Sequence, residues 1–239
     1  MGTYSLDRNN TVALVTGANR GLGAALVQAL RAAGAKKIYA AARDPDQVAP
    51  GKGIIPVRLD VTRTKEITEA GLMCTDVNLL INNAGIAHGT SALDPASLVS
   101  AHAEWETNVV GPLMLTQTFA PILARNGGGA LLNVLSALTW ISVPNGPATY
   151  SATKAALWSL TNSLRIELRA QGTSVAALHV GFMDTDMAGP YNVPKSDPLT
   201  IAQYAVKALQ QGEIEILADD TSRHLKQGLS AGAYLQTAQ

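Results

Sequence analysis

Short apolar runs alternate along the chain with longer segments in which apolar residues recur every three or four positions. The first run, residues 11–16, predicts a buried strand, and residues 22–33 have the spacing of one helix face. The same pattern predicts further strands at 37–41, 54–59, 78–81, 130–135, 174–180 and 213–217. It predicts further helices at 66–73, 95–125, 149–170 and 200–211. The chain is therefore expected to contain about seven strands separated by helices.

The predicted strands are apolar at nearly every position, which indicates that both faces of their sheet are covered. Strands that alternate with helices favour a parallel sheet, because a helix carries the chain back to the start of the next strand. The prediction is an α/β fold in which a doubly wound parallel sheet lies between two helical layers, the Rossmann arrangement. No composition break or long linker divides residues 1–239, so we expect a single domain.

The composition excludes several classes of protein. Eighteen basic and eighteen acidic side chains give a formal net charge of zero, without the basic excess of a nucleic-acid-binding or membrane-surface protein. The single cysteine, Cys74, can form neither an internal disulfide nor a cysteine zinc site, and no metal site is predicted. Residues 1–6 lack the features of a secretory signal, and polar residues interrupt the most apolar stretch, 109–124. We therefore expect a cytoplasmic protein.

A glycine-rich segment lies between the first predicted strand and the first predicted helix. Glycines at positions 17, 21 and 23 permit a tight turn and a close approach of a ligand to the backbone. The helix that follows directs its free N–H groups and positive dipole end at the same place, which suits a pyrophosphate. Such a loop at the start of a βαβ unit predicts a nucleotide-binding site.

Several short motifs follow one another over nearly the whole chain. They are Gly-x3-Gly-x-Gly at 17–23, Asn82-Asn83-Ala84-Gly85, Asn108, Ser136, and Tyr150 with Lys154 on one helix. In this order they resemble the short-chain dehydrogenase/reductase family. The resemblance implies a nicotinamide-dependent oxidoreductase whose first loop holds the cofactor through Gly17, Asn19, Arg20, Gly21, Leu22 and Gly23.

The end of the second predicted strand bears on which nicotinamide is used. NAD-binding folds place an acidic residue there, about 20 residues beyond the glycine loop, to bind the ribose hydroxyls. This chain has Ala42 followed by Arg43, and Arg20 lies in the glycine loop. Because guanidinium groups suit phosphate, we predict that both arginines bind the 2′-phosphate of NADP(H). Alternatively they face solvent, one of them paired with Asp44 or Asp46.

The resemblance implies further cofactor contacts after the third and fourth predicted strands. Asp60, with Val61 beside it, corresponds to the family's aspartate at the adenine ring, although it could also cap the next helix. Asn83, Ala84 and Gly85 correspond to the segment that borders the cofactor, with a plain strand-ending turn as the alternative.

After the sixth predicted strand, Gly181 and Thr185 correspond to a glycine and a threonine of the family. The resemblance implies that this threonine contacts the carboxamide of the nicotinamide. Val180 departs from the proline that is common in the family at this position, which predicts a softer turn with the same contacts.

Tyr150 and Lys154 share one face of a predicted helix because they are four residues apart. A phenol has an ordinary pKa of about 10, too high for easy proton exchange at neutral pH. An ammonium one turn away favours the phenolate, so we predict that Lys154 lowers the pKa of Tyr150. The resemblance implies that Tyr150 is the general acid/base, and that Lys154 also binds the nicotinamide ribose.

Ser136 lies at the carboxyl end of a predicted strand, where α/β sheets bind their ligands. Its hydroxyl could donate to a substrate carbonyl oxygen and polarise it. It precedes Tyr150 by one residue more than is usual in the family, which leaves Ser142 as a second candidate. The resemblance implies that Asn108 takes part in a proton relay from Lys154 to solvent; the alternative is a solvated side chain.

The loops beyond the strand ends carry the candidate substrate contacts. These are His88, Trp140, Phe182, Met187 and Tyr191. Their apolar character predicts a hydrophobic ketone or aldehyde, although each could equally pack within its loop, and the histidine could face solvent. We expect NADPH to reduce this carbonyl reversibly. The apolar faces of the long helix and of the Tyr150 helix predict a homodimer or homotetramer.

Two other functions are compatible with this sequence pattern. A redox-inactive NADP-binding regulator could use the same fold, but it predicts an eroded catalytic set, whereas Ser136, Tyr150 and Lys154 are all present. A sugar-nucleotide epimerase or dehydratase would be a relative with a larger carboxyl-terminal substrate region than the residues after Thr185 provide.

Overall fold

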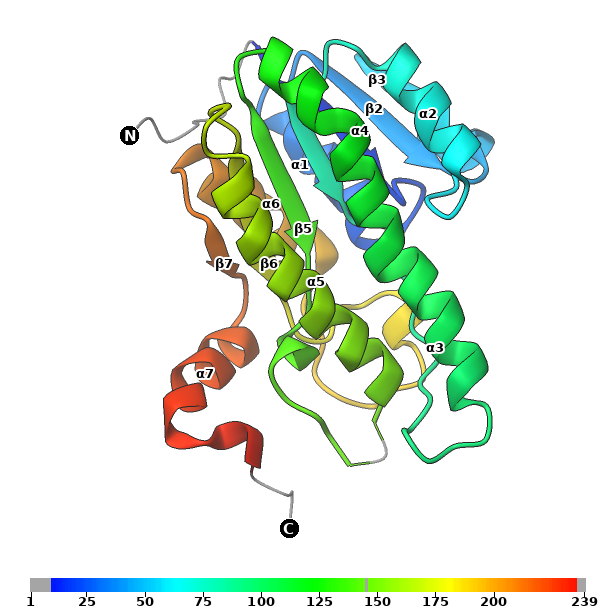
Figure 1. The fold of residues 1–239 in the computed structure, drawn as a ribbon, viewed down its shortest axis with the longest axis vertical. Coiled ribbons are helices and arrows are strands. Elements are labelled where there is room, and N and C mark those ends of the chain that lie inside the picture. The colour runs from blue at the N-terminus through cyan, green and yellow to red at the C-terminus, as the bar shows by residue number, and fades with distance from the viewer. Residues whose placement is uncertain (1–9, 145, 236–239) are drawn as a thin grey trace.

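The computed structural model describes residues 10–144 and 146–235, and shows a central sheet with helices packed on both sides (Figure 1). In these residues seven parallel strands form the sheet in the order β3-β2-β1-β4-β5-β6-β7. The strands are β1 Val12–Thr16, β2 Lys37–Ala42, β3 Ile54–Arg58, β4 Leu79–Asn82, β5 Ala130–Val134, β6 Ser174–His179 and β7 Glu215–Leu217. This is the doubly wound order, so the predicted fold class is confirmed.

Helices cover both faces of the sheet. One face carries α1 (Gly21–Ala32) and α6 (Pro198–Gln210). The opposite face carries α2 (Thr64–Met73), α4 (Gly111–Arg125) and α5 (Ala148–Glu167). Outside these layers lie α3 (Ser97–Trp105) and α7 (Asp220–Gly228). Short 3₁₀ turns are η1 Pro45–Gln47, η3 Ala137–Thr139, η4 Asp186–Ala188, η5 Leu229–Ala231 and η6 Ala233–Leu235.

The buried residues divide into two main cores, because successive side chains of a strand point to opposite faces of the sheet. In β1, Ala13 and Val15 belong to the core beneath α1 and α6. Val12 and Leu14 belong to the core beneath α2, α4 and α5. All four are almost completely buried, which explains why this strand is an uninterrupted apolar run.

The long helix predicted for 95–125 is interrupted by a π-helical segment. α3 ends at Trp105, the π helix runs from Glu106 to Val110, and α4 begins at Gly111. π segments are rare and often mark functional sites, and this one contains the predicted site residue Asn108. The predicted long helical region is confirmed, but the π segment within it was not predicted, because apolar spacing does not distinguish a single wide turn.

The helix α7 was not predicted, since its sequence DTSRHLKQG lacks a repeating apolar face. Its beginning nevertheless carries a local signal. The carboxylate of Asp219 accepts a hydrogen bond from the backbone N–H of Ser222 at 2.7 Å, and the Ser222 hydroxyl lies 3.3 Å from the backbone nitrogen of Asp219. This reciprocal capping box satisfies the free donors of a first turn and starts a helix without apolar periodicity.

The site-forming loops gather where the order of the strands reverses, between β1 and β4. The glycine-rich loop follows β1, Asn83 follows β4, and Ser136 lies just after β5. Parallel strands end at the same edge of their sheet, and ligands bind outside the carboxyl ends at such a switch point. The fold therefore brings these predicted site residues to one edge.

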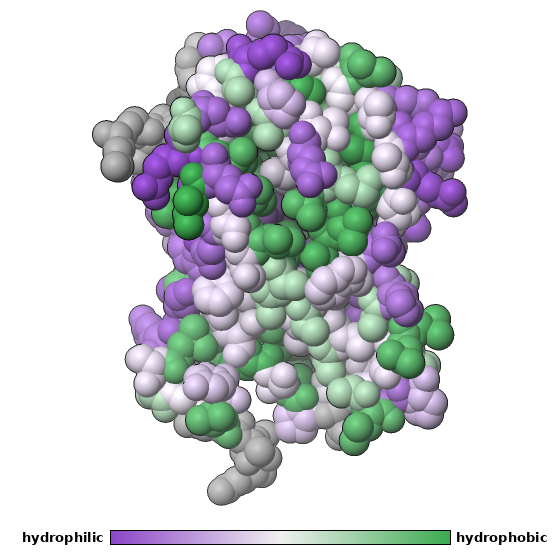
Figure 2. Space-filling view, in the orientation of Figure 1, coloured by the Kyte–Doolittle hydropathy of each residue, from purple (hydrophilic) through white to green (hydrophobic). Residues whose placement is uncertain are grey.

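Figure 2 shows hydrophobic residues over the middle of the face that carries α4 and α5. Exposed apolar side chains include Leu98 and Val99 of α3 and Ile166 of α5. Apolar surface of this kind is what paired subunits bury. It supports the homo-oligomer, which stays a prediction.

Within residues 10–144 and 146–235, no helix is long and apolar enough to cross a membrane. No group of three His, Cys, Asp or Glu side chains in them could hold a metal ion. The prediction that residues 1–6 form no secretory signal concerns residues outside the described part of the chain.

Candidate active site

The glycine-rich loop between β1 and α1 folds tightly against the first turn of the helix. Gly17 and Gly21 have φ angles of 65° and 52°, in the left-handed region that favours glycine. A Cβ at Gly23 would lie 2.0 Å from the carbonyl oxygen of Gly17. Leu22 is buried in the core, so that its backbone alone can face a cofactor. The loop thus has the close backbone packing predicted for it.

The beginning of α1 is free to bind an anion. Arg20 is the N-cap residue, no side chain caps the helix, and its first turn contains no acidic residue. The backbone N–H groups of a first helical turn lack partners within the helix, and the helix dipole favours negative charge there. Within the glycine-rich loop, the Asn19 side chain donates a hydrogen bond to the side chain of Gln47 at 2.9 Å.

Hydrogen bonds tie the loop after β1 to the loop after β4. The Thr16 hydroxyl accepts from the backbone N–H groups of Asn83 and Ala84, both at 3.0 Å. The side chain of Asn83 donates to the carbonyl oxygen of Thr16 at 2.8 Å and to that of Gly17 at 3.3 Å. The segment after β4 is therefore more than a plain strand-ending turn, because it fixes the glycine-rich loop.

The two arginines predicted to bind phosphate have different surroundings. Arg43 is exposed, and its side chain makes no hydrogen bond or ion pair with any described residue. Asp44 does not pair with it but instead caps η1, accepting from the backbone N–H of Asp46 at 3.2 Å. Arg20 forms an exposed ion pair with Asp186 at 2.8 Å. Arg43 is thus available to a ligand, whereas Arg20 would have to exchange a partner.

Asp60 follows β3 and does not cap α2, whose N-cap residue is Arg63. Its carboxylate accepts instead from the backbone N–H and hydroxyl of Thr62, at 2.9 and 2.8 Å. Burial disfavours the charged carboxylate, but the two hydrogen bonds with Thr62 contribute to holding its pKa below the usual value. Val61 beside it is buried. The adenine contact of this pair stays a prediction.

The segment after β6 is held from two sides. The backbone N–H of Gly181 donates to the carboxylate of Asp219 at 2.6 Å. Thr185 lies against the glycine-rich loop, since a Cβ at Gly21 would be 3.3 Å from the Thr185 methyl carbon. Asp219, which the sequence analysis did not single out, therefore fixes the turn that places Thr185.

Three predicted catalytic residues meet at the carboxyl end of β5. Lys154 is buried; its Nζ donates to the carbonyl oxygen of Val134 at 2.9 Å and lies 5.6 Å from the centre of the Tyr150 ring. The side chains of Ser136 and Tyr150 are near enough to interact, and this interaction acts to lower the pKa of the Tyr150 phenol. Ser142 is exposed, and no such contact joins it to Tyr150. The geometry therefore favours Ser136 over Ser142.

Asn108 is buried in the π segment, so the alternative of a solvated side chain is wrong. Its Oδ1 accepts from the backbone N–H of Ile86, and its Nδ2 donates to the carbonyl oxygen of Ile86, both at 2.9 Å. Nδ2 also donates to the Thr153 hydroxyl at 3.0 Å. A Cβ at Gly85 would lie 3.2 Å from Asn108 Oδ1 and 3.6 Å from Lys154 Nζ. The proton relay stays a prediction.

The candidate substrate residues separate into different environments. The rings of Phe182 and Tyr191 pack with their centres 5.1 Å apart, and Gly89 lies beside the Tyr191 hydroxyl. Met187 is exposed. Trp140 stacks on His179, with ring centres 4.0 Å apart. Tyr191 thus packs on Phe182 of its own loop and links that loop to Gly89 of the loop after β4, while Trp140 packs within the protein.

His88 stands beside a buried carboxylate that the sequence did not reveal. Its backbone N–H donates to Oε1 of Glu104 at 2.7 Å, and its ring Nδ1 lies 3.6 Å from the same oxygen. Glu104 is fully buried, and its Oε2 has no hydrogen-bond partner among the described residues. The spacing of apolar residues along a helix does not show that a carboxylate between them is buried.

Comparison with known sequences identifies the family of this chain. The sequence profile of the family described as short chain dehydrogenase matches residues 11–195. The chain belongs to the short-chain dehydrogenase/reductase family. A relative in Synechocystis, named 3-oxoacyl-[acyl-carrier-protein] reductase, is 31% identical over 222 residues, which cover 87% of this chain and 89% of that protein.

Solved structures show the same fold. A short-chain dehydrogenase from Burkholderia cenocepacia in complex with NADP is 35% identical, with a TM-score of 0.89 and 95% of each chain covered. A 3-ketoacyl-(acyl-carrier-protein) reductase from Brucella melitensis complexed with NADH is 26% identical, with a TM-score of 0.79 and coverage of 88% of this chain and 97% of that one. The protein is an oxidoreductase of this family.

The pKa of Tyr150 in this short-chain dehydrogenase differs from the value that its spacing from Lys154 predicts. Burial raises the pKa of Tyr150 to about 12, the interaction with Ser136 opposes that rise, and the charge of Glu104 adds to it. Burial also lowers the pKa of Lys154 to about 8. The prediction that Lys154 lowers the pKa of Tyr150 is wrong for the protein alone, because burial dominates at both groups.

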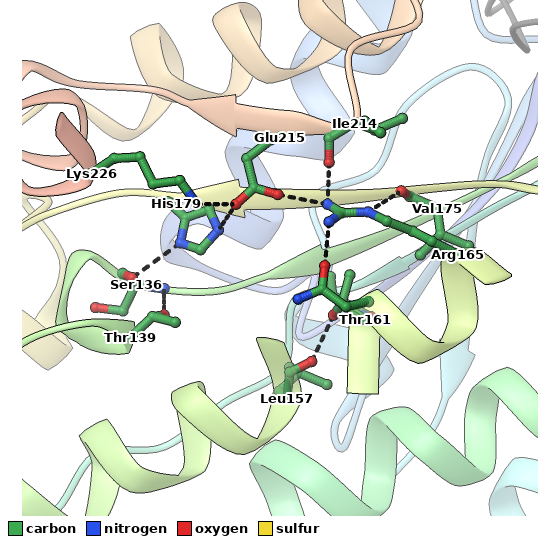
Figure 3. Close-up of polar contacts among 12 residues, drawn as sticks. Ser136, Thr139, Leu157, Thr161, Arg165, Val175, His179, Ile214, Glu215 and Lys226 are labelled. Carbon is green, nitrogen blue, oxygen red and sulfur yellow. Dashed lines mark hydrogen bonds and ion pairs between the residues drawn. The ribbon is translucent and has the colours of Figure 1, made fainter. Parts of the chain in front are cut away.

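A partly buried network of charged side chains surrounds His179 next to Ser136 (Figure 3). His179, the last residue of β6, has its Nε2 3.1 Å from Oε1 of Glu215. Glu215 also accepts from Arg165 at 2.8 Å and from Lys226 at 3.3 Å. Burial disfavours the Glu215 charge, but hydrogen bonds from His179 and Arg165, and their charges, lower its pKa to about 2.

This pKa predicts an acid-sensitive contribution to stability. Because the folded value lies below that of an unfolded glutamate, Glu215 stabilises the fold above about pH 4.5, and the contribution is lost as the pH falls towards about 2. We expect Glu215→Gln to lower the free energy of unfolding by about 2 kcal/mol at pH 7, and by much less near pH 3. Urea unfolding at both values checks this, with exposed Glu213→Gln as the control. An equal loss for Glu215→Gln at both values would contradict it.

Proposed function

We propose that the protein is an NADP(H)-dependent reductase that converts a ketone or aldehyde to an alcohol, and that also catalyses the reverse oxidation. One observation carries the proposal: Ser136, Tyr150 and Lys154 meet at the carboxyl end of β5. A hydroxyl donor, a phenol and a buried amine are the groups that protonation of a carbonyl oxygen requires.

The residues around the glycine-rich loop fit a dinucleotide phosphate. The uncapped start of α1 suits a pyrophosphate, and unpaired Arg43 suits a 2′-phosphate, which Ala42 does not repel. Asn83, Gly181 and Thr185 border this loop or the turn packed on it and would complete the cofactor site. When bound, the nicotinamide supplies the hydride and, once oxidised, a positive charge.

In the reduction, Ser136 donates a hydrogen bond to the substrate oxygen and orients the carbonyl. Tyr150 transfers its phenolic proton to that oxygen as the negative charge develops there. A pKa of about 12 keeps the phenol protonated at neutral pH but makes it a weak acid, so the transfer depends on nearby positive charge that stabilises the phenolate. Lys154, fixed on the carbonyl of Val134, is placed to hold the ribose and to favour the phenolate after transfer.

The substrate class follows from the surrounding side chains. Phe182 and Tyr191 offer aromatic surface, which suits a hydrophobic carbonyl compound. The Synechocystis relative and the Brucella enzyme are both named as reductases of an acyl carrier-bound 3-oxo group, and these names support a ketone. A cytoplasmic location and a homodimer or homotetramer belong to the same proposal.

The proposal is tested by following the loss of NADPH absorbance with a panel of hydrophobic ketones and aldehydes. We expect turnover with at least one of them. A protein that is saturated with NADPH, as shown by its binding isotherm, and reduces none of them would instead be the redox-inactive regulator. A nucleotide sugar that is converted without net NADPH loss would favour the epimerase.

Arg43→Ala tests the choice of cofactor. A charge-assisted hydrogen bond to phosphate contributes about 1.5 to 3 kcal/mol, so we expect the Kd for NADPH to rise about 10-fold or more. The Kd for NADH should stay within about twofold, since that cofactor lacks the phosphate. Titration calorimetry with both cofactors measures the two values. Exposed Arg63→Ala is the control, and an unchanged Kd for NADPH in Arg43→Ala would exclude this role of Arg43.

A further inference from the structure

The turn that carries Ser136 is held at both ends by one buried imidazole. The carbonyl oxygen of Ser136 lies 3.3 Å from Nδ1 of His179. Trp140, which follows the last residue of the turn η3, stacks on the His179 ring with 4.0 Å between centres and 19° between planes. Within the turn, the backbone N–H of Leu138 donates to the Ser136 hydroxyl at 3.1 Å. Each end of residues 136–140 is thus in contact with His179.

The imidazole is in turn held by charged groups of two later elements (Figure 3). His179 is fully buried, and its Nε2 lies 3.1 Å from Oε1 of Glu215 in β7. Lys226 of α7 lies 3.3 Å from the same carboxylate oxygen. Its Nζ also lies 4.8 Å from the centre of the Trp140 ring and 5.2 Å from that of Trp158.

The indole groups are held by their faces rather than by their N–H groups. The buried Nε1 atoms of Trp140 and Trp158 have no hydrogen-bond partner among the described residues. Trp140 is therefore oriented by stacking on His179, by the ammonium of Lys226 and by its edge-to-face contact with Trp158, whose ring centre lies 6.4 Å away. A cation over an indole ring is attracted by its π electrons, most strongly where water is excluded.

We propose that His179, Trp140, Glu215 and Lys226 form a support cluster that positions the Ser136 hydroxyl for catalysis. The inference rests on the proposed function, and it extends the active site to α7, beyond the residues that match the family profile. These four are positioning residues that act through Ser136. A displacement of a catalytic group by about 1 Å can cost about 100-fold in rate. A loosened turn should therefore lower kcat while leaving the cofactor site intact.

Lys226→Met tests the inference from the outer side of the cluster, where the side chain is one-third exposed and the fold is least at risk. We expect kcat for carbonyl reduction to fall about 5- to 20-fold, with the Kd for NADPH unchanged within twofold. Lys226→Arg keeps a cation over the rings and should restore at least half of kcat. Lys207→Met, the same change on the exposed side of α6, should have no effect.

Tryptophan fluorescence gives a second measurement, which reports the packing of the support cluster without an activity assay. In a Trp105→Phe background, the remaining tryptophans are the two that contact Lys226, so their fluorescence reports its loss. We expect acrylamide to quench Lys226→Met more strongly than the parent protein, and Lys226→Arg no more strongly. An unchanged quenching constant would show that Lys226 does not hold the indoles, which would overturn the inference.

The remaining outcomes separate the two proposals. If quenching rises in Lys226→Met but kcat is unchanged, the cluster is packing alone and the inference fails while the proposed function stands. A fall in kcat that Lys226→Arg does not reverse would also overturn it, because the cation would then not be the cause. If the unsubstituted, NADPH-saturated protein reduces no carbonyl compound, the proposed function fails, and the positioning role fails with it.

Discussion

Carbonyl reduction should fall by about 100- to 10,000-fold in Tyr150→Phe, the range that a positioned general acid contributes. The substitution removes the phenolic hydroxyl and keeps the ring, so the packing of α5 against its neighbours should persist. The Ser136 side chain, which interacts with the Tyr150 phenol, loses that interaction in this variant. The rate of NADPH consumption at saturating substrate measures the effect.

NADPH binding distinguishes a catalytic loss from a structural one in this variant. We expect the Kd for NADPH to change by no more than about threefold, because Lys154 keeps its hydrogen bond to Val134. Tyr204→Phe, the same change on a half-exposed tyrosine of α6, is the matched control and should keep full activity. Reduction at more than about one-tenth of the normal rate in Tyr150→Phe would show that another group delivers the proton.

The sequence was most informative where chemistry and chain order coincide. Glycines 17, 21 and 23, placed between an apolar run and a helical period, predicted a loop that the structure shows packed on α1. Tyr150 and Lys154 were predicted on one helix face, and the distance between the Lys154 Nζ and the Tyr150 ring confirms it. Such features are local, since a turn or a helical turn is specified by the residues within it.

The sequence did not predict contacts between residues that are far apart along the chain. His179 meets Ser136 only because β5 and β6 are paired, and Glu215 joins them from β7. Glu104 lies in a helix whose apolar pattern hid a buried carboxylate. The same limit explains the wrong pKa prediction for Tyr150, because the spacing of two residues reveals their mutual distance but not the burial around them.

Gly23→Ala should weaken NADPH binding about 100-fold, although Gly23 lies inside a helix, where alanine is ordinarily the better residue. The added Cβ would stand 2.0 Å from the Gly17 carbonyl oxygen and 2.6 Å from Nδ2 of Asn83. The first of these atoms belongs to the backbone, so the loop itself must move away from α1. That movement displaces the amides at the start of the helix, which the proposed pyrophosphate needs in place.

Gly71→Ala is the control that separates this clash from the effect of the substitution itself. Gly71 is also helical, and its added Cβ would meet the Thr118 methyl carbon at 2.6 Å, which a side-chain rotation can relieve. We expect NADPH binding to Gly71→Ala within about twofold of the original value, measured by titration calorimetry. Thermal unfolding shows whether Gly23→Ala remains folded; if it does not, Gly21→Ala, which strains a residue with a φ angle of 52°, provides the second test. A folded Gly23→Ala with unchanged affinity would mean that the cofactor does not bind over this loop, because no arrangement of the present backbone accommodates the added carbon.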